Sequence, residues 1–201
     1  MQKILVWDWP VRLGHWLMAG GFITAWLTSE SETWRLVHVV SGATVVAVAL
    51  FRLPWGLIGS RYAKFVDFVR GPTAVKDYLA SLLRLEPDHH AGHNPAGGWA
   101  IILLLGLAIL SGLSGWAIYN DLGGEVFEEL HEGLTGAMLA VVIVHLAGVV
   151  TGSLLHGENL VRAMLTGHKQ GSPEEAIPSA RPLAAVVLLA WIALAGWFIA
   201  S

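Results

Sequence analysis

Histidines are the residues of this sequence whose positions suggest chemistry. His131 and His145 stand at the two ends of the stretch "HEGLTGAMLAVVIVH", which is otherwise mostly apolar, and His15 and His38 lie in two earlier apolar stretches. A neutral imidazole is a common metal ligand in proteins. The chain has no Cys, which excludes disulfides, thiolate metal sites and iron–sulfur clusters. Histidine is therefore the first candidate to hold any redox metal centre.

The composition indicates an all-α integral membrane protein that does not bind nucleic acid. Hydrophobic residues make up 55% of the chain and charged residues only 13%, with a mean hydropathy of +0.60. A helix needs about 20 mainly apolar residues to cross the hydrocarbon core of a bilayer. Five runs meet or nearly meet this length, and we expect Pro54 to kink or end the second of them. They cover residues 11–28, 36–58, 99–118, 133–155 and 183–200.

The charges between these runs predict how the chain crosses the membrane. Every Lys and Arg except Arg35 falls at the N-terminus, at the inner end of the second span, in the second connection or after the fourth span, whereas the first and third connections are acidic. Cytoplasmic segments carry the excess of basic residues. We therefore expect a cytoplasmic N-terminus and, with five spans, an external C-terminus. An amphipathic helix is expected within the second connection, and residues 156–182 are expected to form a polar linker.

The spacing of the four histidines predicts two pairs at different depths. Because an α-helix turns about 100° and rises about 1.5 Å per residue, His131 and His145 share one face about 21 Å apart. His38 lies near the outer end of its span, as His131 does, and His15 lies near the inner end, as His145 does. We expect an outer pair, His38 with His131, and an inner pair, His15 with His145. Two facing imidazoles suit a six-coordinate haem iron, whereas zinc usually takes four ligands.

Nearby arginines and a glycine extend this prediction. Gly42, one turn after His38, would leave room for a porphyrin, although small residues also mediate helix packing in membranes. Arg52 shares the face of His38 at the depth of the inner pair, where its charge needs an anion such as a haem propionate unless it reaches the interface. Arg12 and Arg35 are candidate partners for inner and outer propionates. We expect the remaining histidines, which are His89, His90, His93, His156 and His168, at the interface or in loops, although the spacing of the first three could bind a metal.

Four segments of the chain resemble the spans of the bacterial cytochrome b561 family, which includes the b-type cytochrome subunit of nickel-iron hydrogenases. They read "VWDWPVRLGHWLMAG", "VHVVSGATVVAVALFR", "GHNPAGGWAIILLLGLAILSGLSGW" and "ELHEGLTGAMLAVVIVHLAGVVTGSLLHGENLVRAMLTG". The resemblance implies a four-helix transmembrane bundle over residues 1–168 in a bacterial inner membrane. It also implies two haem b groups, with His15, His38, His131 and His145 as axial ligands. Residues 169–201 would add a linker and a fifth transmembrane helix.

The leading functional hypothesis is an electron-transfer subunit of a respiratory chain rather than a stand-alone enzyme. It would exchange electrons between the quinone pool and a periplasmic partner, either a hydrogenase-like dehydrogenase or a c-type cytochrome. A superoxide:quinone oxidoreductase is an alternative that the acidic outer loops disfavour, because they repel an anionic substrate. A haem-free transporter or assembly factor is a further alternative, disfavoured because every Asp and Glu falls in a loop or at a span end. A homo-oligomer remains open.

Overall fold

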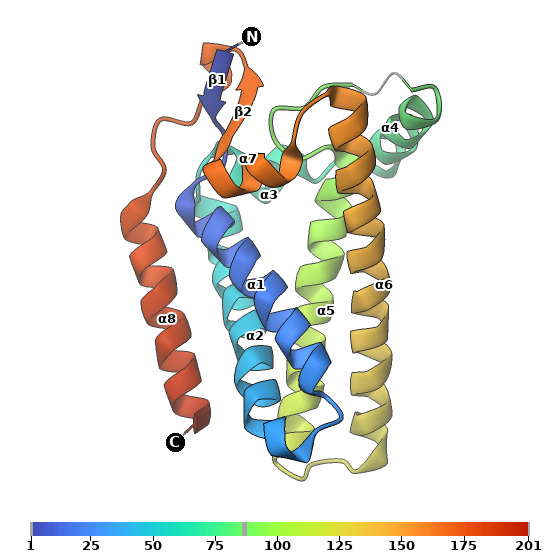
Figure 1. Ribbon diagram of the computed structural model, residues 1–201, viewed down its shortest axis with the longest axis vertical. Coiled ribbons are helices and arrows are strands. Elements are labelled where there is room, and N and C mark those ends of the chain that lie inside the picture. The colour runs from blue at the N-terminus through green and yellow to red at the C-terminus, as the bar shows by residue number, and fades with distance from the viewer. Residues whose placement is uncertain (1, 86–87, 201) are drawn as a thin grey trace.

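The structure is a computed structural model that describes residues 2–85 and 88–200 and consists almost entirely of helices (Figure 1). Five long helices run along one axis, and the two chain termini lie at opposite ends of it (Figure 1). In chain order the elements are β1 Gln2–Leu5, α1 Trp9–Thr28, η1 Glu32–Trp34, α2 Arg35–Ile58, η2 Arg61–Ala63, α3 Phe65–Phe68, α4 Pro72–Leu83, α5 Pro95–Tyr119, α6 Glu125–His156, α7 Leu160–Thr166, β2 His168–Gly171, η3 Pro173–Glu175 and α8 Pro182–Ala200.

The apolar helices confirm an all-α integral membrane protein with several spans. Among the described residues, four helical stretches are long and apolar enough to cross a membrane: Glu32–Ile58, Pro95–Tyr119, Glu125–His156 and Pro182–Ile199. The first predicted span differs from these four. It forms α1, whose 20 residues give a length of about 30 Å, but Arg12 and His15 reduce its mean hydropathy. Helix α1 is therefore less apolar than the other four long helices, although it runs beside α2 (Figure 1).

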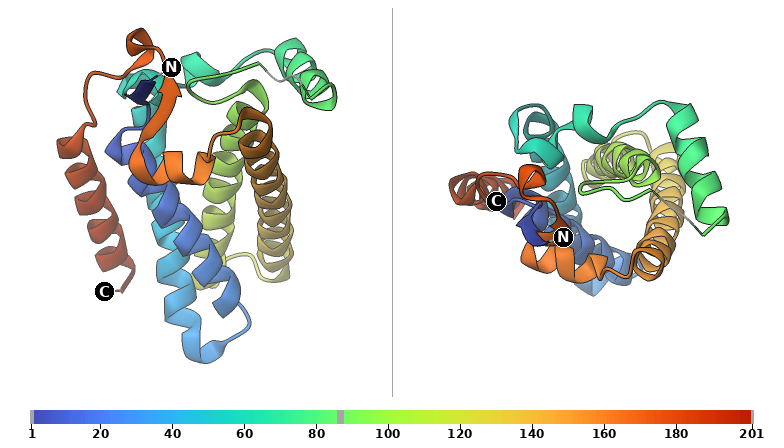
Figure 2. Two further views of the ribbon diagram at one scale, coloured as in Figure 1. Left: turned by 45° about the horizontal axis from the view of Figure 1, so that its top comes forward. Right: turned by 90° about the horizontal axis from the view of Figure 1, so that it is seen from above.

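Helix α2 is the centre of the bundle. It packs against α1, α5 and α8, and α5 packs in turn against α6. Viewed from above, α8 lies outside the group formed by the other long helices, on the side of α1 and α2 (Figure 2). Helix α6 packs mainly against α5 and has no extensive packing with α1 or α2. Pro54 does not end α2, which continues to Ile58.

Short polar residues cap the beginnings of two of the long helices, α1 and α5. Asp8 caps α1, its Oδ1 accepting a hydrogen bond of 2.9 Å from the backbone N–H of Val11. Asn94 caps α5 in the same way through the N–H of Gly97 at 2.7 Å. Such side chains satisfy backbone donors that the first turn of a helix leaves free. Helix α6 ends at Gly157, whose φ of 61° is the left-handed conformation that glycine adopts without strain.

The base-rich end of the bundle carries a folded cap that the sequence did not predict. Residues 156–182, expected as a linker, contain α7, β2 and η3. Strand β2 pairs antiparallel with β1, with Gln2 opposite Gly171 and Leu5 opposite His168. Beneath the strands a small buried core joins the two ends of the chain to the second connection; it consists of Ile4, Val6, Trp7, Val11, Tyr62, Ala63, Ala91, Ala163 and Ile177.

Candidate functional site

The predicted inner pair of histidines faces across the bundle. His15 on α1 and His145 on α6 have ring centroids 6.3 Å apart and ring planes 53° apart. The Nδ1 atom of His15 is buried and has no hydrogen-bond partner among the described residues. The two rings come from helices that do not pack extensively against each other.

The predicted outer pair has the same separation. His38 on α2 and His131 on α6 have ring centroids 6.2 Å apart. In both rings Nδ1 lies close to a backbone carbonyl, 2.8 Å from the oxygen of Ala25 for His38 and 2.9 Å from that of Ser111 for His131. Since a carbonyl only accepts, each Nδ1 must carry the hydrogen and donate. The lone pair then lies on Nε2, which is the protonation pattern of a metal-binding imidazole oriented by a second hydrogen bond.

The separation of the rings fits one metal ion between each pair. A bond of about 2.0 Å from imidazole nitrogen to metal, plus about 1.1 Å from that nitrogen to the ring centre, places two opposed rings roughly 6.2 Å apart. The two observed separations, 6.3 and 6.2 Å, agree with this value. Among the described residues, no group of three or more His, Asp or Glu side chains is placed to hold a metal ion. Two-histidine ligation is thus the arrangement that the geometry supports.

Glycines beside the histidines leave space for a planar macrocycle. A Cβ atom added at Gly42, Gly136 or Gly148 would meet nothing within 4 Å. Gly14, next to His15, is different, because a Cβ atom there would lie 3.1 Å from a side-chain carbon of Val48. Gly14 therefore serves helix packing, whereas the other three border open space on α2 and α6.

The three predicted arginines have different surroundings. Arg52 is the one placed for an intramembrane anion: its Nη1 is buried and has no hydrogen-bond partner among the described residues. Its guanidinium carbon lies 5.2 Å from the ring centroid of Phe65, so the cation rests on an aromatic face. The side chain of Arg12 instead donates to the carbonyls of Met164, at 3.4 Å, and Leu165 on α7. Arg35 is exposed at the other end of the bundle.

The contacts of Asp8 were not predicted from the sequence. Asp8 is fully buried, and besides capping α1 it accepts a hydrogen bond of 3.1 Å from Trp55 Nε1; it is also an acidic neighbour of Arg52. An Asp two residues before Pro10 indicates the start of a helix. The sequence does not indicate that Asp8 also accepts a hydrogen bond from Trp55 or lies near Arg52.

His93 was expected at the interface, but its ring lies between two aromatic rings. The centroid separations are 4.5 Å to Trp7 and 4.8 Å to Phe68. Burial, and secondarily the charge of Arg52, lowers the pKa of His93 to about 3. Its Nδ1 has no partner in the described part of the chain. His89 and His90 turn elsewhere, toward His156 and Tyr78 respectively, so the three histidines of this segment do not converge.

Comparisons with known proteins identify the family of the chain. The family model described as prokaryotic cytochrome b561 matches residues 6–167. Relatives include proteins named "Probable Ni/Fe-hydrogenase B-type cytochrome subunit" from Rhizobium leguminosarum bv. viciae, 23% identical over 84% of this chain and 89% of the relative, and from Rhodobacter capsulatus, 25% identical over 83% and 81%. The subunit named for Ni/Fe-hydrogenase 1 of Escherichia coli K12 is 27% identical over 58% of this chain and 60% of its own. No solved structure matches significantly. The predicted resemblance is confirmed, and the chain belongs to the prokaryotic cytochrome b561 family, a family of membrane b-type cytochromes.

Proposed function

We propose that this protein is a di-haem b-type cytochrome that carries electrons between the quinone pool and a redox partner protein. The observation that carries the proposal is a pair of opposed imidazole rings at each of two depths along α6, at His145 and at His131, with centroid separations of 6.3 and 6.2 Å. When bound, haem b supplies reversible one-electron chemistry at its iron. Family membership implies haem b, and the number of two is our inference from the two ring pairs.

The residues around each ring pair support electron transfer rather than ligand chemistry at the iron. His15 with His145 and His38 with His131 would occupy both axial positions, leaving none for oxygen or a substrate. Hydrogen bonds from Nδ1 to the carbonyls of Ala25 and Ser111 would leave Nε2 of each outer ring free to bind the haem iron. The buried guanidinium of Arg52 supplies positive charge for an anionic group such as a propionate at the inner site.

The distribution of charge supports an orientation and a class of partner. Nearly all bases lie at one end of the bundle and the acidic turns at the other, so by the positive-inside rule the base-rich end faces the cytoplasm. The N-terminus would then be cytoplasmic and the C-terminus periplasmic. The acidic end would attract a partner that presents a basic surface. The names of the relatives favour a hydrogenase as that partner, with a c-type cytochrome as the alternative.

Transmembrane electron transfer is the direct test of the proposal. The purified protein is reconstituted into liposomes with ferricyanide trapped inside, and dithionite, which does not cross the bilayer, is added outside. We expect the protein to accelerate ferricyanide reduction well above the rate of protein-free liposomes. His131→Ala and His145→Ala should each abolish the acceleration, because either change removes one of the two stacked sites.

A second assay addresses the quinone. Adding a short-chain quinol to the oxidised protein in detergent should produce the α-band of reduced haem b within the mixing time of a stopped-flow experiment. His156→Ala is a matched control, since it removes a histidine of the same helix that is paired with neither site. Protein that contains haem but is not reduced by quinol would contradict the quinone part of the proposal. In the liposome assay, ferricyanide reduction no faster than in protein-free liposomes would contradict the proposed electron path.

A further inference from the structure

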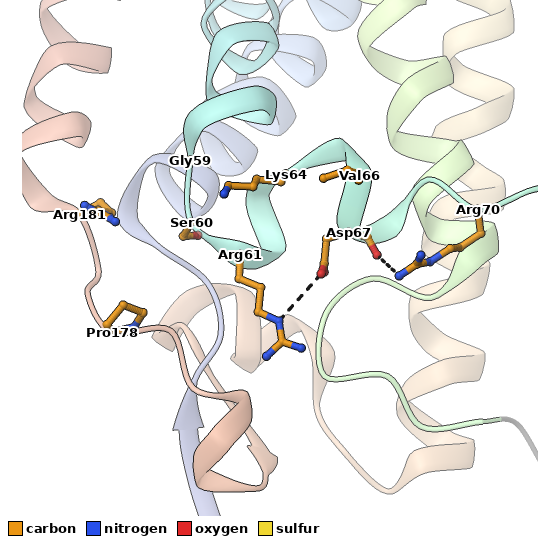
Figure 3. A pocket seen from close by; sticks show the side chains of 9 residues that line it. All are labelled: Gly59, Ser60, Arg61, Lys64, Val66, Asp67, Arg70, Pro178 and Arg181. Atoms are coloured by element: carbon orange, nitrogen blue, oxygen red, sulfur yellow. Dashed lines mark hydrogen bonds and ion pairs between the residues drawn. The ribbon is translucent and has the colours of Figure 1, made fainter.

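A cavity of about 380 Å³ lies at the base-rich end of the molecule, away from both histidine pairs. The turn after α2 and the short helices η2 and α3 form one wall, and the segment leading into α8 forms the other (Figure 3). Residues far apart in the sequence thus share this cavity. The lining residues include Ser60, Arg61, Lys64, Asp67 and Arg70 from the first wall and Arg181 from the second.

Positive charge around the cavity is only partly neutralised. Arg61, Lys64, Arg70 and Arg181 line it together with one acid, Asp67. Arg61 Nε lies 3.9 Å from a carboxylate oxygen of Asp67, and Arg70 donates to the backbone carbonyl of Asp67 at 2.7 Å (Figure 3). In the described part of the chain, the side chains of Lys64 and Arg181 have no acidic partner. The cavity therefore has an excess of cationic groups free to bind an anion.

A buried hydroxyl group in the wall also lacks a partner. Ser60 is only 5% exposed, and its Oγ makes no hydrogen bond to any described residue. Buried hydroxyl groups in proteins are normally hydrogen-bonded, because desolvation without compensation is unfavourable. A hydroxyl group among lysine and arginine side chains can donate to an anionic oxygen, as the cations do. Ser60 thus indicates a ligand independently of the cluster of charges.

The rim of the cavity is apolar where it meets the membrane-spanning helices. Val66 in the wall is 77% exposed, Ile58 at the end of α2 is 75% exposed and Leu183 at the start of α8 is 81% exposed. Val66 lines the cavity, Ile58 directly precedes the lining residue Gly59, and Leu183 follows the lining residue Arg181 by two positions. A ligand that has an anionic head and apolar chains would match both parts of the surface.

We propose that this cavity binds the phosphate headgroup of an anionic phospholipid from the leaflet that faces the base-rich end. Basic pockets between helices on the cytoplasmic side bind such headgroups in membrane proteins. Lys64, Arg181 and the Oγ of Ser60 contact the phosphate oxygens, and the acyl chains run along Ile58, Val66 and Leu183. The bound lipid joins the segment before α8 to the turn after α2. Deeper in the bundle, the same two helices are joined by the hydrogen bond of 2.8 Å from Trp191 Nε1 to the carbonyl of Ala47.

Native mass spectrometry of the full-length, delipidated protein with its cofactor tests this inference. Phosphatidylglycerol and phosphatidylcholine with the same acyl chains are added separately, and inorganic phosphate is added in a third series. We expect one phosphatidylglycerol to bind at least tenfold more tightly than phosphatidylcholine. Lys64→Gln combined with Arg181→Gln should remove this preference. Lys76→Gln combined with Arg84→Gln, which neutralises two bases outside the cavity, should leave it unchanged.

Three results would overturn the assignment. They are equal binding of the two lipids, full preference in the Lys64/Arg181 variant, and complete displacement of the lipid by millimolar inorganic phosphate, which would mean that the site recognises a free anion. Ser60→Ala is a milder second variant that should weaken phosphatidylglycerol binding severalfold; an unchanged affinity would argue against contact with the hydroxyl group. The measured haem content separates this test from the proposed electron transfer, because lipid binding at the cavity does not require either histidine pair.

Discussion

Replacing Asp8 by alanine should destabilise the protein more than replacing any exposed acidic residue. The Asp8 carboxylate accepts hydrogen bonds from two donors and lies near the buried cation of Arg52. Its Oδ1 caps α1 through Val11 N at 2.9 Å, and its Oδ2 accepts from Trp55 Nε1 at 3.1 Å. Loss of the cap costs about 1 kcal/mol, and loss of the indole hydrogen bond costs about 1–2 kcal/mol. Arg52 also loses an acidic neighbour. We therefore expect a total of roughly 2–3 kcal/mol for Asp8→Ala.

The predicted order of stability separates these contributions. For a chain of this size, about 2–3 kcal/mol corresponds to a fall in Tm of roughly 4–12 °C, measured by the temperature dependence of monodispersity in detergent. Asp8→Asn should fall between wild type and Asp8→Ala, since the amide oxygen can still cap the helix but cannot serve both donors. Asp77→Ala, at an exposed position of α4, is the matched control. A Tm for Asp8→Ala within 1 °C of that control would refute the reasoning.

Three further predictions follow from the contacts around the sites. Gly136→Leu should lower the haem content by filling open space beside the outer pair. Gly106→Leu is the control, because Gly106 lies on α5, which carries no ligand histidine, and it should leave the haem content unchanged. Equal haem content in the two variants would contradict the prediction. The pKa of His93 is lowered to about 3 by burial, so between that value and its ordinary 6.5 the unfolded state binds more protons and stability decreases as the pH falls. Between pH 7 and 5 the free energy of unfolding of His93→Phe should therefore fall less than that of wild type, by up to about 2 kcal/mol, with a correspondingly smaller drop in Tm. Parallel curves of Tm against pH would exclude this role. Trp191→Phe removes the hydrogen bond to the Ala47 carbonyl and should lower Tm by about 2–4 °C with unchanged haem; a loss of haem would show that α8 supports the sites.

The pairing of the histidines was predictable because it depends on regular quantities. The rise and rotation of a helix place His131 and His145 on one face, and the alternating direction of successive spans assigns each a partner at its own depth. The structure places the rings of both predicted pairs about 6 Å apart. A Cβ atom at Gly42 would meet nothing within 4 Å, and Nη1 of Arg52 is buried without a partner among the described residues; their roles in cofactor binding stay predictions.

The base-rich cap was not predictable because it depends on contacts between distant parts of the chain. Strands β1 and β2 are four residues each and lie at opposite ends of the sequence, so neither has a recognisable local pattern. The same cap explains the position of Arg12, whose side chain binds carbonyls of α7. His93 was missed for a similar reason, since the aromatic rings that enclose it come from the N-terminal segment and from α3.

Haem stoichiometry is the most direct test of the central claim that two histidine pairs each hold one haem b. A pyridine haemochrome assay on the purified protein should give two haems b per chain. His145→Ala and His131→Ala should each give one, and His156→Ala should retain two. One haem in the wild type, or complete loss of haem in either single ligand variant with the fold intact, would contradict the assignment of two independent sites.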